Sequence, residues 1–130
     1  MSNEEPDLPT DQFIEDVVAN ERVWHLSNDD GVANTASIDD ENTVVLMFWS
    51  QQNLAQRVMH SGFDDYQVVE IPLFDFLVGW LPGMDEDAVL TGLNWTKDLV
   101  GIETDPDQLR DDIQQQLPAE TLTRYEAMSE

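Results

Sequence analysis

The sequence predicts a single α+β domain in which helices pack on a mixed, mostly antiparallel sheet. Its 130 residues are close to the commonest size of one globular domain. Hydrophobic residues make up 41% of the chain, and four Trp, five Phe and two Tyr supply enough large apolar surface for a core. Short β-branched runs and amphipathic stretches follow one another along the chain, and this mixture indicates both strands and helices.

The N-terminal segment differs in composition from the rest of the chain. Residues 1–9 are acidic and contain two prolines and a single Leu, so they predict a disordered tail before a domain at 10–118. Thr10 is a suitable N-cap for a first helix from Asp11 to Arg22. One face of this helix is apolar and consists of Phe13, Ile14, Val17 and Val18.

The next segments favour extended structure. Residues 23–26 and 32–37 flank the turn residues Asn28 to Gly31, which predicts a β-hairpin. Residues Thr43 to Trp49 are β-branched, aromatic and apolar without alternation, as is typical of a strand that is covered on both faces. We therefore expect this segment to be the central strand of the sheet.

A helix from Gln51 to His60, capped by Ser50, is expected after the central strand. Residues 66–71 are rich in β-branched side chains and favour another strand. Pro72 then suits the first turn of a third helix, which we expect Leu81-Pro82-Gly83 to stop.

The last part of the chain repeats this alternation. Two short strands, at 88–95 and 99–103, are expected around a turn at Thr96-Lys97-Asp98. Asp105-Pro106 then starts a helix that is expected to end at Pro118, with an apolar face at four-residue intervals formed by Leu109, Ile113 and Leu117. Residues 119–130 are expected to form a short C-terminal helix or a frayed tail.

Charge and composition exclude several classes of partner. With 28 acidic and five basic residues, the net charge of -23 excludes direct binding to nucleic acid and to anionic membranes. The absence of cysteine removes disulfides and thiolate metal sites and fits a reducing compartment. The longest apolar stretch, at 44–49, is too short to cross a bilayer, and the acidic start of the chain is unlike a signal peptide. We therefore expect a cytoplasmic protein.

No signature of a known catalytic centre is present in the sequence. Of the two histidines, His25 lies in an apolar strand, where we expect a half-exposed structural side chain. The adjacent carboxylates Asp85, Glu86 and Asp87 are the best of several weak metal candidates, but they lack the spacing of a calcium loop. We expect no catalytic residue, no metal site and no cofactor.

The most informative feature is a gap in the acidic residues, because residues 42–63 contain no Asp or Glu. Within this gap, four polar side chains share one face of the second helix: Asn53, Gln56, Arg57 and His60. A partner that docks on this face desolvates no carboxylate. The first functional hypothesis is therefore a non-enzymatic binding or protein-interaction module that uses this face for a protein partner. The alternative for these residues is that the helix lies buried under a neighbouring segment.

A second hypothesis is an enzyme or small-ligand binder with a pocket near Trp49, Trp80, Asn94 and Trp95. Each of these Trp residues ends an apolar element, so core packing in one cluster is the competing expectation. The amide of Asn94 stands within an apolar stretch and must find hydrogen-bond partners. We expect it to tie down the turn at 81–84.

The acidity itself has two explanations. Asp and Glu residues are spread over nearly every predicted loop, as suits a protein of a salt-rich cytoplasm in which a charged surface maintains solubility. The other explanation is a nucleic-acid mimic, which needs its carboxylates in one directed stripe. The even distribution favours adaptation to salt.

Five short aromatic and turn motifs follow one another along the chain. They are Phe48-Trp49-Ser50, Glu70-Ile71-Pro72-Leu73, Phe76, Trp80-Leu81-Pro82-Gly83-Met84 and Gly92-Leu93-Asn94-Trp95. Over roughly Phe13 to Leu109, their order and spacing resemble the bacterial family catalogued as domain of unknown function 2750. This resemblance implies a small single-domain protein and supplies no catalytic residues.

Overall fold

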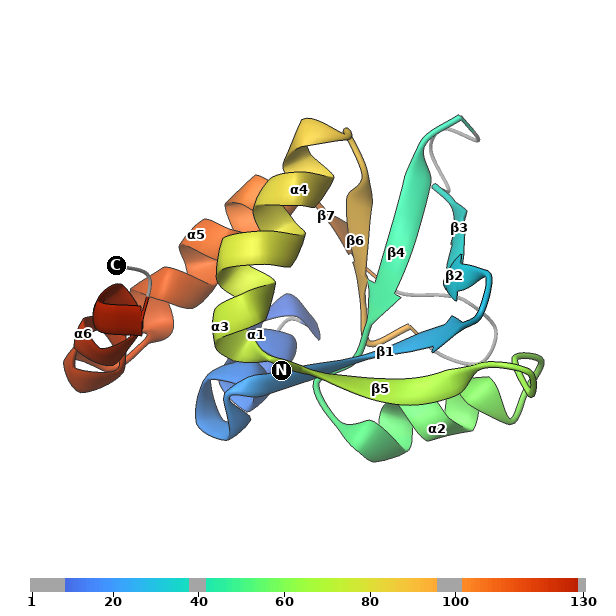
Figure 1. Cartoon of the computed structure of the whole chain (residues 1–130), viewed down its shortest axis with the longest axis horizontal. Coiled ribbons are helices and arrows are strands. Elements are labelled where there is room, and N and C mark those ends of the chain that lie inside the picture. The colour runs from blue at the N-terminus through green and yellow to red at the C-terminus, as the bar shows by residue number, and fades with distance from the viewer. Residues whose placement is uncertain (1–8, 38–41, 96–101, 129–130) are drawn as a thin grey trace, which may run out of the picture.

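A computed structural model describes residues 9–37, 42–95 and 102–128 (Figure 1). The helices are α1 (Pro9–Asn20), α2 (Gln52–Met59), α3 (Leu73–Asp75), α4 (Leu81–Glu86), α5 (Pro106–Gln116) and α6 (Ala119–Met128), with a π-helical turn η1 (Phe76–Trp80). The strands are β1 (Arg22–Asn28), β2 (Gly31–Val32), β3 (Asn34–Ala36), β4 (Val44–Phe48), β5 (Gln67–Pro72), β6 (Leu90–Leu93) and β7 (Ile102–Thr104). The tail is predicted at 1–9; its last residue, Pro9, begins helix α1, and residues 1–8 lie outside the described residues, as does the predicted turn at 96–98. The elements form one mixed α+β domain, as the sequence predicts.

Two small sheets replace the single sheet that the sequence predicts. Strands β2, β1 and β5 form an antiparallel sheet, and a second sheet has the order β3-β4-β6-β7. In the second sheet only β4 and β6 are parallel. The sheets meet where Trp24 and Trp49 exchange two backbone hydrogen bonds of 2.9 Å.

The predicted hairpin is confirmed for β1 and β2, but its second arm divides between the sheets. Gly31 and Val32 pair with β1, while Asn34 to Ala36 pair with β4. Between them, the backbone N–H of Ala33 donates to Leu26 at 2.8 Å. The second arm of the hairpin is therefore divided into two short strands, one in each sheet. A pattern of β-propensity predicts extended structure for such a segment but not which sheet each residue joins.

Strand β4 lies inside its sheet and is covered on both faces over most of its length. Phe48 packs in a cluster on the side of the long helices, together with Phe13, Phe76 and Leu109. Val45 and Met47 point to the opposite face and pack in a second cluster that contains α2. This arrangement confirms the inference from its unbroken apolar sequence.

The helices lie in two groups (Figure 1). Helices α1, α5 and α6 and the continuous α3–η1–α4 segment gather on one side of the sheets, and α2 packs against β1 and β5 on the other. Helix α2 therefore packs on the sheet face opposite to α3–η1–α4, α5 and α6, and approaches α1 at its N-terminal end, where Gln51 donates to Asp16 at 3.1 Å.

The third helix does not stop at Leu81-Pro82-Gly83 as the sequence predicts. It continues through η1 into α4, which ends at Glu86. The π turn lets the N–H of Leu81 reach back five residues to the oxygen of Phe76, and Pro82 then occupies the first turn of α4. A proline is tolerated there because the π turn before it has already changed the pattern of backbone hydrogen bonds in the helix.

The last described residues form helix α6, which is hydrogen-bonded to Glu21, the residue that follows α1. Arg124 Nη2 and the Tyr125 hydroxyl donate to one oxygen of Glu21 at 2.7 and 2.8 Å. These hydrogen bonds hold the pKa of Glu21 below its ordinary value, and the bond from Tyr125 has the largest effect. Burial, and then the bond to Glu21, raise the pKa of Tyr125.

Candidate functional site

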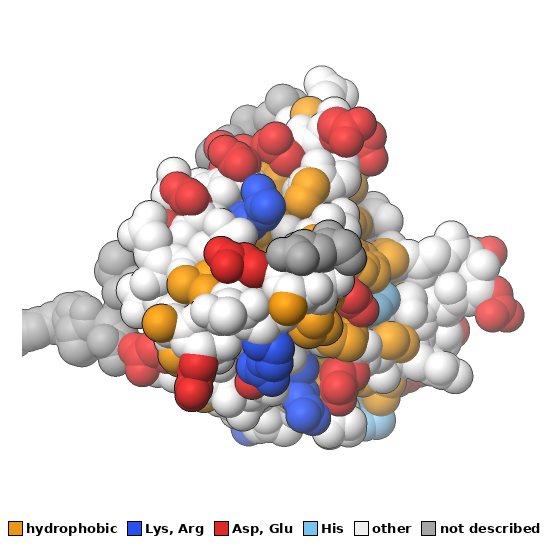
Figure 2. Space-filling view, turned by 60° about the vertical axis from the view of Figure 1, so that its left-hand side comes forward, with side chains coloured by type: hydrophobic (Ala, Val, Ile, Leu, Met, Phe, Trp, Pro, Cys, Tyr) orange, Lys and Arg blue, Asp and Glu red, His pale blue; other side chains and the backbone are white. Residues whose placement is uncertain are grey.

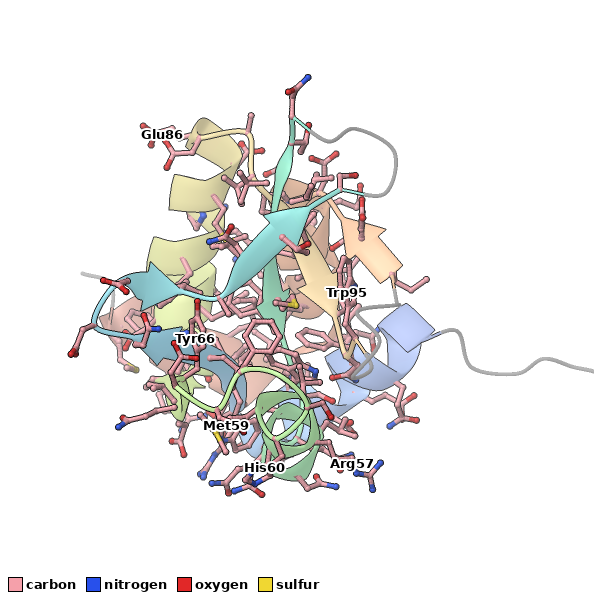
Figure 3. All side chains as sticks on the ribbon, turned by 90° about the vertical axis from the view of Figure 1, so that its right-hand side faces the viewer. Arg57, Met59, His60, Tyr66, Glu86 and Trp95 are labelled. Carbon is pink, nitrogen blue, oxygen red and sulfur yellow. The ribbon has the colours of Figure 1, made fainter. Side chains whose placement is uncertain are left out.

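The four polar residues predicted on α2 are all exposed. Asn53, Gln56, Arg57 and His60 face solvent, whereas Ala55 and Val58 on the other side of the helix are buried. In Figure 3, Arg57 and His60 extend from the outer side of α2. The alternative that this helix lies under a neighbouring segment is therefore wrong for this face.

Ser50, two positions before α2, has a different role from the one predicted. Ser50 is fully buried, and the N-cap position belongs to Gln51, whose side chain makes no capping bond. The Ser50 hydroxyl instead donates to Asp16 of α1 at 2.8 Å. Ser50 thus joins α2 to α1 rather than ending the helix.

Asn94 is held against this same serine. Its Oδ1 accepts the backbone N–H of Ser50 at 2.8 Å, and its Nδ2 donates to the Ser50 hydroxyl at 3.0 Å. Its own N–H donates to Phe48 at 2.9 Å. The expectation that Asn94 ties down the turn at 81–84 is wrong, because the parallel pairing of β4 and β6 places it beside the end of β4.

Two of the predicted pocket tryptophans form one buried unit. Trp49 is fully buried, and its indole N–H donates to the carbonyl of Trp95 at 2.9 Å. The Trp95 indole donates in turn to Ile102 of β7 at 2.9 Å. The ring of Trp95 lies directly over Gly92, which has no side chain to displace it. Trp95 therefore has a fixed orientation at the end of β6.

Trp80 belongs to a different part of the molecule, so the prediction of one tryptophan cluster is wrong. It is half-buried on η1, in the cluster on the side of the long helices. Its ring contacts His25 at a centroid distance of 4.9 Å and Phe48 at 5.8 Å. Because η1 and α2 cover opposite sides of the sheets, Trp80 does not border the same cavity as Trp95.

A hollow of about 550 Å³ lies between the C-terminal half of α2 and the end of β6. Among the described residues, its lining comprises Leu54, Arg57, Val58, His60, Ser61, Asn94 and Trp95. Figure 3 shows Trp95 lying above α2 on the side toward Arg57. The hollow thus brings half of the predicted α2 face together with half of the predicted aromatic pocket. We call this combined surface the α2 site.

Sequence reasoning assigned the other residues of the α2 site to different roles. The helical spacing of Leu54 and Val58 is typical of a core-facing apolar stripe, and no motif around Ser61 indicates a site. The spacing Leu54, Val58, Ser61 follows one helical face that also contains Arg57, so the signal was present. Asn53 and Gln56 flank the hollow without lining it.

The α2 site differs in charge from its surroundings. None of its described lining residues is acidic. In the part of the chain that the structure describes, Arg57 forms no ion pair, whereas Arg22 pairs with Glu70 at 3.4 Å. An uncommitted guanidinium beside apolar side chains can hold an acidic group that has an apolar neighbour.

The other residues considered for chemistry lie elsewhere. His25 is buried, not half-exposed, because it faces Trp80 rather than solvent. Burial lowers the pKa of His25, and the backbone of Leu26, which acts to raise that pKa, offsets only part of this effect. Asp85, Glu86 and Asp87 are exposed, and no three described His, Asp or Glu residues are grouped as a metal site. Within the described ranges, none of the helices has the length and apolar character to cross a membrane.

Comparison with known proteins gives a family but no described activity. The family model "Protein of unknown function (DUF2750)" matches residues 10–113. No curated protein matches the chain. The match spans α1 to most of α5 and includes every residue that lines the α2 site. The chain therefore belongs to the DUF2750 family of proteins of unknown function.

Proposed function

We propose that this protein is a non-enzymatic interaction module that binds a protein partner through the α2 site. One observation carries the proposal. On a chain with a net charge of -23, the hollow beside α2 holds Arg57, which pairs with no carboxylate among the described residues, and none of its described lining residues is acidic. Docking there avoids the cost of desolvating acidic side chains, which most other faces of this molecule would impose.

The chemistry of the α2 site indicates the kind of segment it takes. Leu54 is partly exposed in the hollow, and the buried Val58 and Trp95 line it with little exposed surface. Arg57 and His60 are exposed at its edge. A segment with one apolar side chain beside an acidic residue satisfies both, because the apolar group enters the hollow and the carboxylate meets Arg57. Asn53 and Gln56 add neutral hydrogen-bonding groups outside the hollow.

We further propose that the module works in a salt-rich cytoplasm. The cysteine-free composition and the excess of 28 acidic over five basic residues support this setting. On the face shown in Figure 2, acidic side chains are scattered among apolar ones rather than aligned. This scatter favours adaptation to salt over imitation of a phosphate backbone.

Site-specific photocrosslinking tests the interaction. A photoreactive phenylalanine analogue replaces Gln56 on α2 or, as control, Gln116 at the exposed end of α5. We expect a partner to be crosslinked in cells from position 56 and not from 116, and we expect Arg57→Glu to reduce the yield. Equal capture from both positions, or capture insensitive to Arg57→Glu, would contradict the proposal.

A small-ligand binder is the second candidate, favoured by the volume of the hollow and by the wall of Trp95. Titration of labelled protein with phenylacetate and with neutral phenylacetamide tests this function by NMR. Selective shifts at Trp95, Arg57 and Ser61 with phenylacetate support it. Shifts of equal size for both compounds would remove the role given to Arg57.

A further inference from the structure

The arginines of this protein divide into two kinds. Arg22 and Arg124 form ion pairs with Glu70 and Glu21. Within the described residues, Arg57 and Arg110 pair with no carboxylate, although the chain has 28 acidic residues. Both unpaired arginines line a hollow: Arg57 lines the α2 site, and Arg110 lines a groove on the other side of the molecule.

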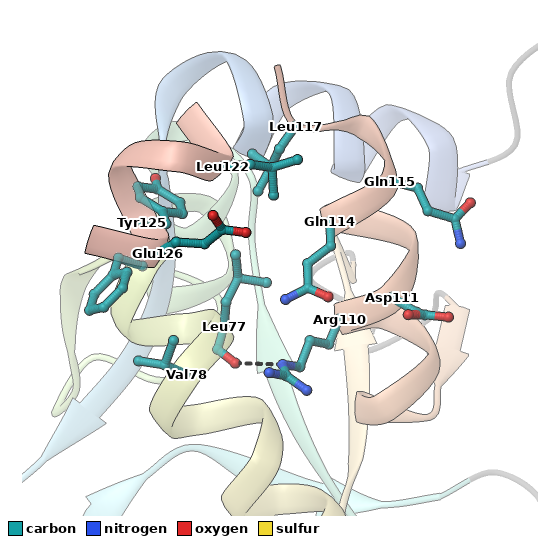
Figure 4. A pocket seen from close by; sticks show the side chains of 11 residues that line it. Leu77, Val78, Arg110, Asp111, Gln114, Gln115, Leu117, Leu122, Tyr125 and Glu126 are labelled. Carbon is teal, nitrogen blue, oxygen red and sulfur yellow. Dashed lines mark hydrogen bonds between the residues drawn. The ribbon is translucent and has the colours of Figure 1, made fainter. Parts of the chain in front are cut away.

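The position of Arg110 is fixed by the π turn. The N–H of Leu81 donates to Phe76, so the next carbonyl in this ladder, that of Leu77, would need the N–H of residue 82. Residue 82 is a proline and has none. Arg110 Nε donates to the Leu77 carbonyl instead, at 3.0 Å (Figure 4). This bond orients the guanidinium and uses one of its five N–H groups.

The groove beside Arg110 has an apolar side and a polar end. It measures about 420 Å³ and lies between η1 and helices α5 and α6. Val78 and Leu122 provide apolar surface, and Val78 leaves 46% of its area exposed, whereas the Leu77 side chain is buried. Gln114, one turn after Arg110 on α5, points into the same space (Figure 4). We call this surface the Arg110 groove.

The acidic residues of the groove stand away from its polar end. Asp111 and Glu126 also line it. In Figure 4, Asp111 extends to the far side of α5, whereas the carboxylate of Glu126 points from α6 into the groove, farther from the guanidinium of Arg110 than Gln114 is. An anionic group is therefore expected next to the guanidinium of Arg110, at the end of the groove away from Glu126.

We propose that the Arg110 groove binds a small organic carboxylate with a short aliphatic body. The carboxylate accepts from the terminal nitrogens of Arg110, whose planar fork matches two oxygens, and from the Gln114 amide. The aliphatic chain covers Val78 and Leu122, and the volume of the groove falls within the range of small-molecule sites. This site is separate from the α2 site and does not depend on the function proposed for it.

A competing explanation is that Arg110 only satisfies the Leu77 carbonyl. Replacing Arg110 would not separate the two roles, because both would be lost. Gln114→Glu separates them, since it places a negative charge at the polar end of the groove and leaves the bond from Arg110 to Leu77 in place. Gln116→Glu makes the same charge change on the same helix at a residue that does not line the groove.

The test is NMR titration of the labelled full chain with hexanoate and with neutral hexanamide. We expect hexanoate to shift resonances of η1 and α5, and hexanamide to bind roughly tenfold or more weakly. Gln114→Glu should weaken hexanoate binding by a similar factor, and Gln116→Glu and Gln56→Glu should leave it unchanged. Preserved dispersion of the spectra shows that each variant is folded.

Three results would overturn the proposal. The first is the absence of hexanoate-induced shifts in η1 and α5. The second is equal binding of hexanoate and hexanamide, which would remove the anion from the proposal. The third is equal weakening by Gln114→Glu and Gln116→Glu, which would show an effect of net charge alone. If hexanoate shifts only resonances of the α2 site, η1 and α5 show no response, and this outcome also overturns the proposal.

Discussion

Asn94 holds the buried Ser50 through its side chain, with Oδ1 accepting the Ser50 backbone N–H at 2.8 Å and Nδ2 donating to the Ser50 hydroxyl at 3.0 Å. Asn94 also adopts a left-handed backbone conformation, with φ of 53°. Asparagine suits both requirements, because its short amide tolerates this region and supplies a donor and an acceptor. The pair joins the end of β6 to the start of α2 and so sets the edge of the α2 site.

The first prediction concerns this pair. Asn94→Ala should lower the free energy of unfolding by about 2–4 kcal/mol, because it leaves the Ser50 N–H unpaired and strains the backbone. Asn94→Gly removes the same hydrogen bonds but fits a positive φ, so it should cost about 1 kcal/mol less. Denaturant unfolding measures both. Equal losses for the two variants would show that backbone strain is not important at this position.

The second prediction concerns the close approach of Gly92 to Trp95. A Cβ at Gly92 would lie 2.8 Å from two atoms of the Trp95 indole and 3.1 Å from Val45. The indole is held by its bond to Ile102, so it has little room to shift. Gly92→Ala should therefore cost about 1–3 kcal/mol of stability by overpacking.

Gly83 provides the matched control for Gly92. It lies in helix α4, and an added Cβ meets nothing within 4 Å. Gly83→Ala should stabilise the fold by about 0.5–1 kcal/mol through helix propensity. Thermal or denaturant unfolding of both variants gives the comparison, and a stabilising Gly92→Ala would refute the packing described for Trp95.

The third prediction is a dependence of stability on pH through His25. Burial lowers the pKa of His25 from its ordinary 6.5, and its Nδ1 has no hydrogen-bond partner among the described residues. As pH falls through 6.5, the unfolded chain takes up the proton before the folded chain does. Stability is therefore full above pH 6.5 and falls below it, by at most about 1.4 kcal/mol per pH unit.

His25→Phe should remove this dependence between pH 7.5 and 5.5 and keep a ring against Trp80. His60→Gln serves as control, because His60 is exposed on α2 and should leave the dependence in place. Urea unfolding at several pH values measures the slope for each protein. A slope that survives in His25→Phe would place its origin in other groups.

The fourth prediction concerns salt. Repulsion among 28 acidic residues opposes the compact state, and the described residues form two ion pairs that offset little of it. Raising NaCl from 0.01 to 1 M shortens the screening length from about 30 Å to about 3 Å, so the Tm should rise. A neutral osmolyte at the same concentration is the control, and a Tm that is flat or falls with NaCl would argue against adaptation to salt.

Local patterns were sufficient for the elements whose neighbours matched their own preferences. The unbroken apolar run of β4 predicted an interior strand, and the four-residue spacing of Leu109, Ile113 and Leu117 predicted helix α5. The gap in acidic residues predicted the exposed polar face of α2. Each of these signals lies within one short stretch of the chain, so it does not depend on the arrangement of distant segments.

Local rules failed where a distant segment supplied a missing bond. Pro82 ordinarily stops a helix, yet the π turn and Arg110, 28 positions along the chain, allow the helix to continue. Ser50 is a good cap by type, but Asp16 and Asn94 engage its side chain instead. Arg110 was not singled out because its partner is a backbone carbonyl that becomes free only through the helix distortion.

The sequence by itself determined the domain class, the strong acidity and the residues of the α2 face, because these follow from composition and from short-range periodicity. Only the tertiary structure decided that Arg57 and His60 share a hollow with Asn94 and Trp95, and that Trp80 lies elsewhere. The reason is the crossover from β4 to β6. That parallel pairing places residues more than 30 positions apart beside the same helix, and no local pattern records it.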